Sequence, residues 1–138
     1  MDTGFAFARL DPGTGERFVS LRRALGVSTF GINQILLRPG QRGRIHRHTR
    51  QEEVYVVVSG TLALWIEGER HDLQAGEVAR VAPEVRRQIA NPHPEPVLLI
   101  ALGGANEHTG RDGEAFTSWD DTTGAPPQEV PLPDDEPV

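Results

Sequence analysis

The sequence predicts an all-β fold in which short antiparallel strands close into a jelly-roll barrel. Nine short apolar runs alternate with Gly, Pro and Asn turns, and only one segment has a helical pattern. The 15 glycines and 11 prolines are spread along the chain, as expected for many short elements. The 138 residues suit a single domain, and barrel closure removes exposed strand edges.

The expected strands are defined by apolar alternation and end at turn residues. In chain order they are residues 16–21, 29–37, 44–48, 53–59, 61–66, 70–73, 77–82, 85–90 and 96–102. The punctuating pairs are Pro39-Gly40, Ser59-Gly60, Glu67-Gly68, Ala75-Gly76 and Asn91-Pro92. A helical turn over residues 20–25 would end at Gly26.

These elements divide the chain into four parts. Residues 1–27 form an N-terminal strand or arm, 28–104 the barrel, 105–119 a loop that packs on the barrel, and 120–138 an acidic, proline-rich tail. The tail holds six acidic residues, no basic residue and several prolines, so helix and central strand are excluded there. A solvated tail is expected; because Val130 and Leu132 alternate with other residues, packing on a partner is the alternative.

Composition excludes several functions. Cysteine and lysine are absent, which rules out disulfides, thiolate ligands and lysine Schiff bases. The net charge of −6 comes from the tail, and the 14 acidic and 14 basic residues before it cancel, so no nucleic-acid partner is expected. The start of the chain lacks the layout of a secretory signal, and the longest apolar run, residues 97–102, is too short to span a bilayer. We therefore expect a cytoplasmic protein without membrane contact.

One segment carries ligand chemistry. His46 and His48, at i and i+2 on an expected strand, point to the same face, and Glu53 opens the next strand. Two imidazoles and one carboxylate suit a divalent Fe, Mn, Zn, Ni or Co ion, with positions left for water or substrate. Glu52 is the local competitor for the role of carboxylate ligand.

This segment resembles the first conserved motif of the cupin superfamily. Gly, five residues, His-x-His, four residues, Glu, six residues and Gly correspond to Gly40, His46, His48, Glu53 and Gly60. The resemblance covers about residues 28–104 and implies a small single-domain cupin of the cupin 2 type, a double-stranded β-helix. It also implies that His46, His48 and Glu53 hold the metal.

The second cupin motif resembles residues 76–91 but lacks its usual histidine. Apolar alternation through Val85 and Ile89 turns Arg87 inward, whereas counting from Pro83 would turn Gln88 inward; we favour Arg87. A guanidinium cannot ligate a metal and repels it. Either Arg87 swings aside and binds an anionic group beside the metal, or metal affinity falls and Arg87 pairs with Glu53.

Other polar residues complete the expected site. Arg44 has the parity of His46 and faces the mouth, unless it is a solvated rim residue. Gln34 is a candidate wall residue, unless its amide is buried against backbone. We therefore assign substrate binding to Arg87, Arg44 and Gln34. The remaining histidines are expected to be solvated at positions 71 and 93, and His108, with Asp112 and Glu114, lies in a loop that could form a lid.

Two functions follow from this interpretation. The first is a metal-dependent cupin, of oxygenase or isomerase type if an enzyme, that binds or transforms a small anionic molecule. The alternative is a non-catalytic, metal-free binding barrel in which Arg87 replaces the third histidine. The resemblance and the apolar strand faces together suggest a homodimer in which the N-terminal segments are exchanged.

Overall fold

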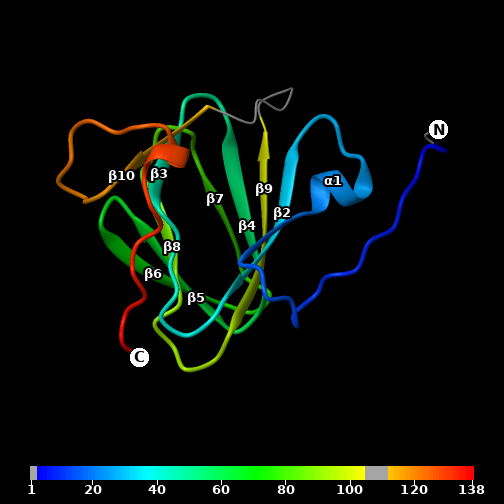
Figure 1. Ribbon diagram of the computed structural model, residues 1–138, viewed down its shortest axis with the longest axis horizontal. Coiled ribbons are helices and arrows are strands. Elements are labelled where there is room, and N and C mark those ends of the chain that lie inside the picture. The colour runs from blue at the N-terminus through cyan, green and yellow to red at the C-terminus, as the bar shows by residue number, and fades with distance from the viewer. Residues whose placement is uncertain (1–2, 105–111) are drawn as a thin grey trace.

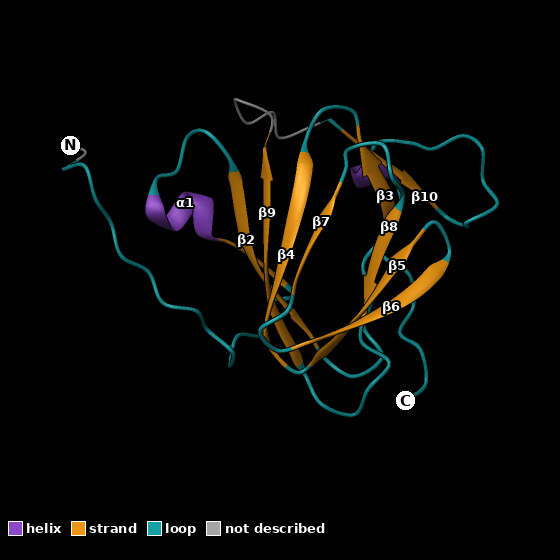
Figure 2. Cartoon of the chain, turned by 180° about the vertical axis from the view of Figure 1, so that it is seen from behind, coloured by secondary structure: helices purple, strands orange, loops and turns teal. Residues whose placement is uncertain are grey.

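The computed structural model describes residues 3–104 and 112–138. Its elements, drawn in Figure 2, are β1 (Phe18–Ser20), α1 (Leu21–Leu25), β2 (Gly31–Leu37), β3 (Ile45–His48), β4 (Glu52–Ser59), β5 (Thr61–Ile66), β6 (Glu69–Gln74), β7 (Val78–Val81), β8 (Arg87–Ala90), β9 (Val97–Gly104), β10 (Gly113–Phe116) and the 3-10 helix η1 (Pro127–Glu129). None of the helices in these residues is long and apolar enough to cross a membrane.

The strands form two five-stranded antiparallel sheets. One has the order β1-β2-β9-β4-β7, and the other has the order β10-β3-β8-β5-β6. Figure 1 shows the two sheets facing each other across the interior, which is the arrangement of a jelly-roll barrel. The core between them is apolar and includes the buried residues Leu37, Val57, Leu62, Leu64, Val97 and Leu99. The predicted fold class is confirmed.

All nine predicted strands are present, with ends shifted by at most two residues. The predicted helical turn is α1, where the Ser20 side chain accepts from the Arg23 N–H and Gly26, at φ +75°, ends the helix. The sequence did not predict β10, which pairs along the whole of β3. Four residues that include Gly113 and Glu114 give no apolar run long enough to indicate a strand.

Two glycines of the first motif have a structural reason. Gly40 and Gly60 have φ of +84° and +80°, where other residues are strained. A Cβ at Gly60 would collide with the Pro96 carbonyl oxygen, and one at Gly40 would collide with that of Glu136. Both positions therefore require glycine for conformation and for space.

The C-terminal tail differs from the expected solvated segment because it lies along its own barrel. Ala125 and Ala115 exchange backbone hydrogen bonds, and the Glu136 N–H donates to the Gly40 carbonyl at 2.8 Å. Val130 is buried. Arginine side chains of the barrel form ion pairs with the acidic end of the tail, and Arg42 lies 2.6 Å from Glu136. The polar, proline-rich tail is therefore held on the barrel by backbone hydrogen bonds and ion pairs rather than by an apolar core of its own.

The N-terminal segment behaves differently. Residues 3–9 are all exposed and extend away from the barrel, beyond α1 (Figure 1). The segment is attached where the Gln34 amide donates to the Asp11 carbonyl at 2.8 Å and accepts from the Asp11 N–H at 2.5 Å.

Candidate metal centre

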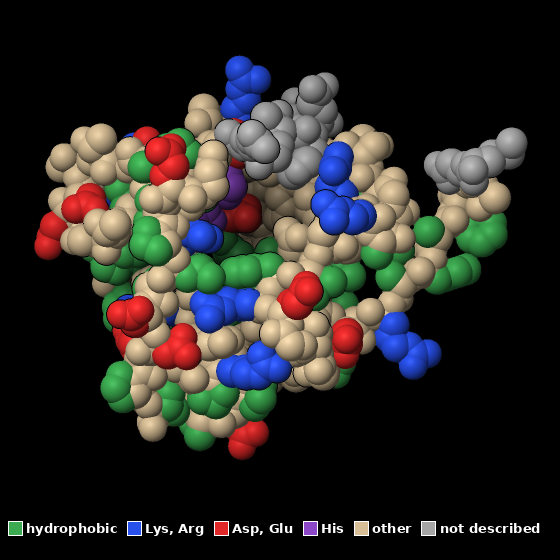
Figure 3. All heavy atoms as spheres, viewed as in Figure 1, with side chains coloured by type: hydrophobic (Ala, Val, Ile, Leu, Met, Phe, Trp, Pro, Cys, Tyr) green, Lys and Arg blue, Asp and Glu red, His purple; other side chains and the backbone are tan. Residues whose placement is uncertain are grey.

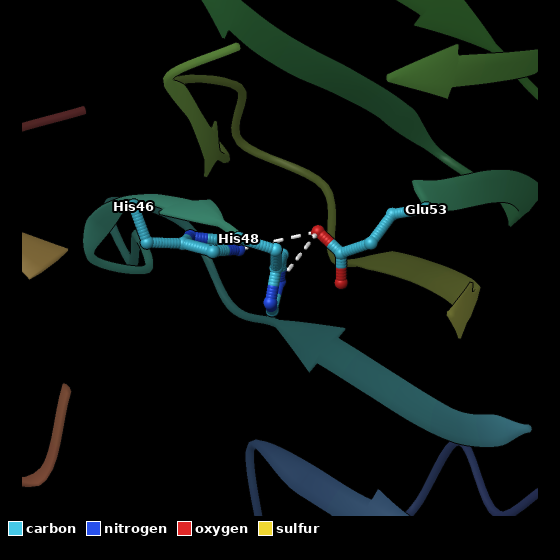
Figure 4. A group of neighbouring side chains, drawn as sticks. All are labelled: His46, His48 and Glu53. Atoms are coloured by element: carbon cyan, nitrogen blue, oxygen red, sulfur yellow. Dashed lines mark hydrogen bonds and ion pairs between the residues drawn. The ribbon is translucent and has the colours of Figure 1, made fainter. Parts of the chain in front are cut away.

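Three predicted ligands converge inside the barrel. His46 and His48 come from β3 and Glu53 comes from β4, and Figure 4 shows both rings directed at the same carboxylate. Glu53 Oε1 lies 3.2 Å from His46 Nε2 and 3.4 Å from His48 Nε2. One donor atom of each residue lies within 4.8 Å of the others. The sequence therefore identified a real spatial cluster from residues on two strands.

The cluster fits a divalent ion. Ligands about 2.1 Å from a common ion are about 3.0–3.4 Å apart when octahedral or tetrahedral, which matches the two contacts to Glu53. His48 Nε2 is buried and has no hydrogen-bond partner among the described residues. An orphaned buried nitrogen is costly, and an ion bound between the three donors would satisfy it.

Both imidazoles are oriented from behind. His46 Nδ1 lies 3.1 Å from the Arg44 carbonyl oxygen, and His48 Nδ1 lies 2.8 Å from Asp112 Oδ1. Carbonyl and carboxylate acceptors at Nδ1 leave Nε2 free to ligate a metal. The backbone N–H groups of Arg50 and Gln51 hold Asp112, each donating to its Oδ2 at 2.9 Å. The sequence predicts Asp112 in a loop that could form a lid and gives no sign of this orienting role, since no local pattern links residues 64 positions apart.

The ionisation of the cluster follows from its burial and its contacts. Burial raises the pKa of Glu53, but the close contacts with His46 and His48 and the charges of these rings outweigh burial and hold this pKa well below its usual range. Burial lowers the pKa of His48, whereas Glu53 and Asp112 together raise it above its ordinary value. Burial, with the Glu53 charge, raises the pKa of Tyr55 well above its usual range, so its hydroxyl stays protonated and donates to Glu53 Oε1 at 2.7 Å.

Arg87, rather than Gln88, faces inward. It lies opposite His46 in the register of β3 and β8, whereas the Gln88 amide donates to the Gly43 carbonyl. The Arg87 side chain is 0 % exposed. Its Nε lies 3.3 Å from Glu53 Oε1. This is the second of the two expected arrangements, in which Arg87 pairs with Glu53.

The other contacts of the Arg87 guanidinium are hydrogen bonds to the backbone. The terminal nitrogens donate to backbone carbonyls of the preceding turn, those of Val81, Ala82, Pro83 and Val85, at 2.7–3.4 Å. In this arrangement Arg87 is directed at Glu53 and the turn and does not line the cavity, and its role in ligand binding stays a prediction. The reason is that the carbonyls of a tight turn lie within reach of the long side chain and satisfy it.

A cavity of about 250 Å³ adjoins the cluster. Its apolar walls include Phe18, Ile35, Ile89, Ala101 and Pro127. Figure 3 shows histidine and acidic side chains deep in a hollow of the surface. Hollows of about 700 and 530 Å³ lie elsewhere and contain none of the three ligands. The smaller cavity is therefore the one that belongs to the candidate metal centre.

The polar wall of this cavity is Asn33 rather than Gln34. Asn33 lines the cavity, whereas Gln34 points to the outer face of β2 and uses its amide on Asp11. Gln34 is therefore not in the predicted position in the cavity wall, and the structure has the alternative arrangement, an amide bonded to backbone.

Arg44 lines the cavity, as expected. Its Nε donates to the Val130 carbonyl of the tail at 2.5 Å, and its terminal nitrogens have no hydrogen-bond partner among the described residues. In the part of the chain that is described, Arg44 is the basic side chain of the cavity wall. The tail thus positions a charged group at the metal cavity, which the sequence did not predict.

The remaining candidates lie outside the cluster. Glu52 is exposed and pairs with Arg80 at 2.6 Å, so Glu53 is the carboxylate of the cluster. His71 is exposed, and His93 lies 3.8 Å from Asp72. Glu114 pairs with an arginine, Arg47, at 2.7 Å. The proposed lid residue His108 lies outside the described residues.

Comparison with known proteins agrees with this architecture. The family model described as "Cupin domain" matches residues 33–103. No curated protein gives a significant match. Among solved structures, the chain is similar to a sugar phosphate isomerase from a cupin superfamily of Silicibacter pomeroyi DSS-3, at 28 % identity and a TM-score of 0.62. That alignment covers 73 % of this chain and 64 % of the other, so this chain spans less than two thirds of that protein's length.

Two further structures match most of their own length. A cupin protein from Bacteroides fragilis is 23 % identical, with a TM-score of 0.66 over 88 % of this chain and 98 % of that one, and supports the fold alone. The Cupin_2 domain of an XRE family transcriptional regulator from Enterobacter cloacae is 26 % identical, with a TM-score of 0.57 over 64 % and 97 %.

Proposed function

The chain belongs to the cupin domain family, and we propose that it binds one divalent metal ion through His46, His48 and Glu53. The observation that carries this proposal is the convergence of three donor atoms within 4.8 Å, one of them a buried imidazole nitrogen that has no hydrogen-bond partner among the described residues. A bound ion would supply Lewis-acid polarisation of a substrate oxygen. Asp112 and the Arg44 carbonyl would keep both rings in the ligating orientation.

We further propose that the adjoining cavity takes a small anionic molecule. A volume of about 250 Å³ corresponds to about eight waters at about 30 Å³ each, which suits a small organic acid or sugar derivative. Arg44 supplies positive charge at the wall, and apolar residues such as Ile35 and Ile89 exclude water. The likeness to a structure described as a sugar phosphate isomerase favours isomerase-type over oxygenase-type chemistry.

A metal-free binding barrel is the second candidate, and one specific observation favours it. The Arg87 Nε lies 3.3 Å from Glu53 Oε1, so a resident cation already neutralises the carboxylate that would ligate the metal. In that case the cavity and Arg44 would bind an anion without an ion in the cluster.

Metal titration of the chelator-treated protein separates the two candidates. Calorimetry with Zn²⁺, Mn²⁺, Ni²⁺ and Co²⁺ is expected to show one ion per chain, and His46→Ala is expected to weaken binding at least 100-fold because one of three ligands is lost. His71→Ala, which removes an exposed histidine on β6, is the matched control and should bind like the wild type. Equal affinity of His46→Ala and wild type would refute the assigned site.

Anion binding is tested separately. Small carboxylates and sugar phosphates are titrated into protein with and without metal, and Arg44→Gln is expected to weaken binding about tenfold or more by removing a charge-assisted contact. Anion binding by a wild type that binds no metal would support the metal-free barrel. Unchanged binding in Arg44→Gln would contradict the role of this side chain.

A further inference from the structure

The cavity beside the metal cluster has few polar groups to offer a ligand. Outside the cluster, the described side chains of its wall include three polar ones, those of Asn33, Arg44 and Tyr55. The Tyr55 hydroxyl is already engaged, because it donates to Glu53 Oε1 at 2.7 Å. Asn33 and Arg44 therefore remain as the polar side chains of the wall that a ligand could contact.

The register of the sheet places Asn33 across the cavity floor from Tyr55. Asn33 on β2 pairs with Ala101 on β9, and Ala101 pairs with Tyr55 on β4, so the three residues form one row. Asn33 has the parity of Ile35, which belongs to the core, and therefore points inward. The middle residue of the row has only a methyl group. The space above it separates the Asn33 amide from the Tyr55 ring, whose strands lie about 10 Å apart.

The Asn33 amide differs from the buried amides of the same protein. Each of the four amide side chains that are buried in the described part of the chain bonds to its own chain, namely Gln34, Gln51, Gln88 and Asn91. The Asn33 side chain makes no hydrogen bond with any other described residue. An unpaired amide on an otherwise apolar wall is the arrangement expected of a group that contacts a ligand.

We propose that Asn33 recognises a hydroxyl group of the ligand, so that the cavity selects small hydroxylated anions over anions that lack a hydroxyl group. The inference rests on the proposed anion site at Arg44. A guanidinium offers donors alone, whereas an amide offers both donors and an acceptor, and a hydroxyl group is likewise both donor and acceptor. Arg44 therefore suits the anionic group of the ligand, and Asn33 suits its hydroxyl group.

The two contacts would come from opposite walls. Asn33 lies on β2, whereas Arg44 directly precedes β3, and these strands belong to the two facing sheets (Figure 1). Apolar residues of the same cavity, such as Ile35 and Ile89, would contact the carbon skeleton and exclude water. A ligand without a hydroxyl group would leave the Asn33 amide unpaired in these apolar surroundings, which is the cost that discriminates against it.

Four acids with one carbon skeleton test the selectivity. Butyrate and the 2-, 3- and 4-hydroxybutyrates, with both enantiomers of the chiral acids, are titrated by calorimetry into chelator-treated and Zn²⁺-loaded protein. The wild type is expected to bind at least one hydroxybutyrate about tenfold more tightly than butyrate in both forms. Asn33→Leu, which replaces the amide by an apolar side chain of similar size, should reduce this preference below threefold and leave butyrate affinity within threefold. Gln74→Leu removes an exposed amide on β6 and should behave like the wild type.

The outcomes separate this inference from the anion site on which it rests. A wild type that binds all four acids equally would overturn the role of Asn33 and leave the anion site at Arg44 standing, whereas a wild type that binds none would remove both. A hydroxyl preference that persists in Asn33→Leu would assign the hydroxyl group to another partner and would also overturn the inference.

Asn33→Asp keeps the shape of the side chain and provides a second test that does not depend on repacking. Its negative charge beside the ligand should weaken binding of the preferred hydroxybutyrate at least tenfold, with folding checked by circular dichroism. Unchanged affinity in this variant would show that residue 33 does not contact the ligand.

Discussion

Replacing Arg87 by histidine tests whether the guanidinium beside Glu53 limits metal binding. Arg87 occupies the register position opposite His46, and its Nε is 3.3 Å from the Glu53 oxygen that faces both imidazoles. The substitution removes a fixed positive charge and introduces a neutral nitrogen donor on the same side of the barrel. Both changes favour a divalent ion, so the affinity for metal is expected to rise.

The size of the increase follows from the distance. An ion about 2.1 Å from Glu53 Oε1 would lie about 5 Å from the guanidinium charge. The repulsion at that distance is about 7 kcal/mol at an effective dielectric constant near 20, and about 1.7 kcal/mol even at that of bulk water. Because about 1.4 kcal/mol corresponds to a tenfold change, the smaller figure already predicts more than a tenfold gain in affinity.

The assay must separate affinity from folding. Removal of the buried guanidinium takes one charged partner from Glu53 and a donor from the carbonyls of residues 81–85, which is expected to lower the free energy of unfolding by about 3–5 kcal/mol. Circular dichroism and urea unfolding establish that the metal-free variant is folded, and calorimetry with Zn²⁺ and Mn²⁺ then measures affinity. Arg23→His, on the exposed side of α1, is the matched control. A folded Arg87→His protein that binds metal no more tightly than the wild type would refute the reasoning.

Three further predictions concern the support of the site. Asp112→Asn weakens the acceptor that orients His48 and should lower metal affinity about 10- to 100-fold in the same titration, whereas unchanged affinity would deny its orienting role. Val130→Asp places a charge at a buried position of the tail and should lower the free energy of unfolding by about 1–3 kcal/mol. It should also free the Arg44 side chain from the tail, which is measured as weaker anion binding. A variant as stable as the wild type would show that the tail is not packed on the barrel. The depressed pKa of Glu53 means that its carboxylate stabilises the fold above its unfolded pKa of about 4.3 and that this stability is lost as pH falls through the lower folded-state pKa. Urea unfolding at pH 7 and pH 3 should therefore show a smaller acid loss for Glu53→Gln than for the wild type, and equal losses would contradict the shift.

The strands and the ligand cluster could be predicted because both depend on short-range periodicity. Alternation and turn residues define each strand, and the i, i+2 spacing of His46 and His48 fixes a shared face wherever the strand lies. Glu53 starts the adjoining segment of the chain, so its approach needs only one turn. The strands of the barrel and the cluster of His46, His48 and Glu53 thus follow from patterns between residues close together in the sequence.

The contacts that hold this cluster and Arg44 in place join residues far apart in the sequence. Asp112 reaches His48 only because β10 pairs with β3, and Arg44 is held by Val130 only because the tail returns along the same sheet. β10 has no apolar pattern that would indicate a docked element, and the alternation of Val130 and Leu132 in the tail does not say which surface the tail packs on. The position of the Arg87 guanidinium depends on the backbone carbonyls of the turn at residues 81–85, and the closed barrel sets the geometry of that turn. Because these contacts join residues far apart in the chain, local sequence patterns do not predict them.

The misplacement of Gln34 has a more specific cause. Parity identifies the inward face of a strand only when one face is apolar and the other polar. In β2 the inward residues Ile35 and Leu37 alternate with outward Ile32 and Leu36, so both faces are apolar and either register satisfies the pattern. Parity alone therefore does not assign the inward face of β2, and the two hydrogen bonds between the Gln34 amide and the Asp11 backbone show that Gln34 lies on the outer face.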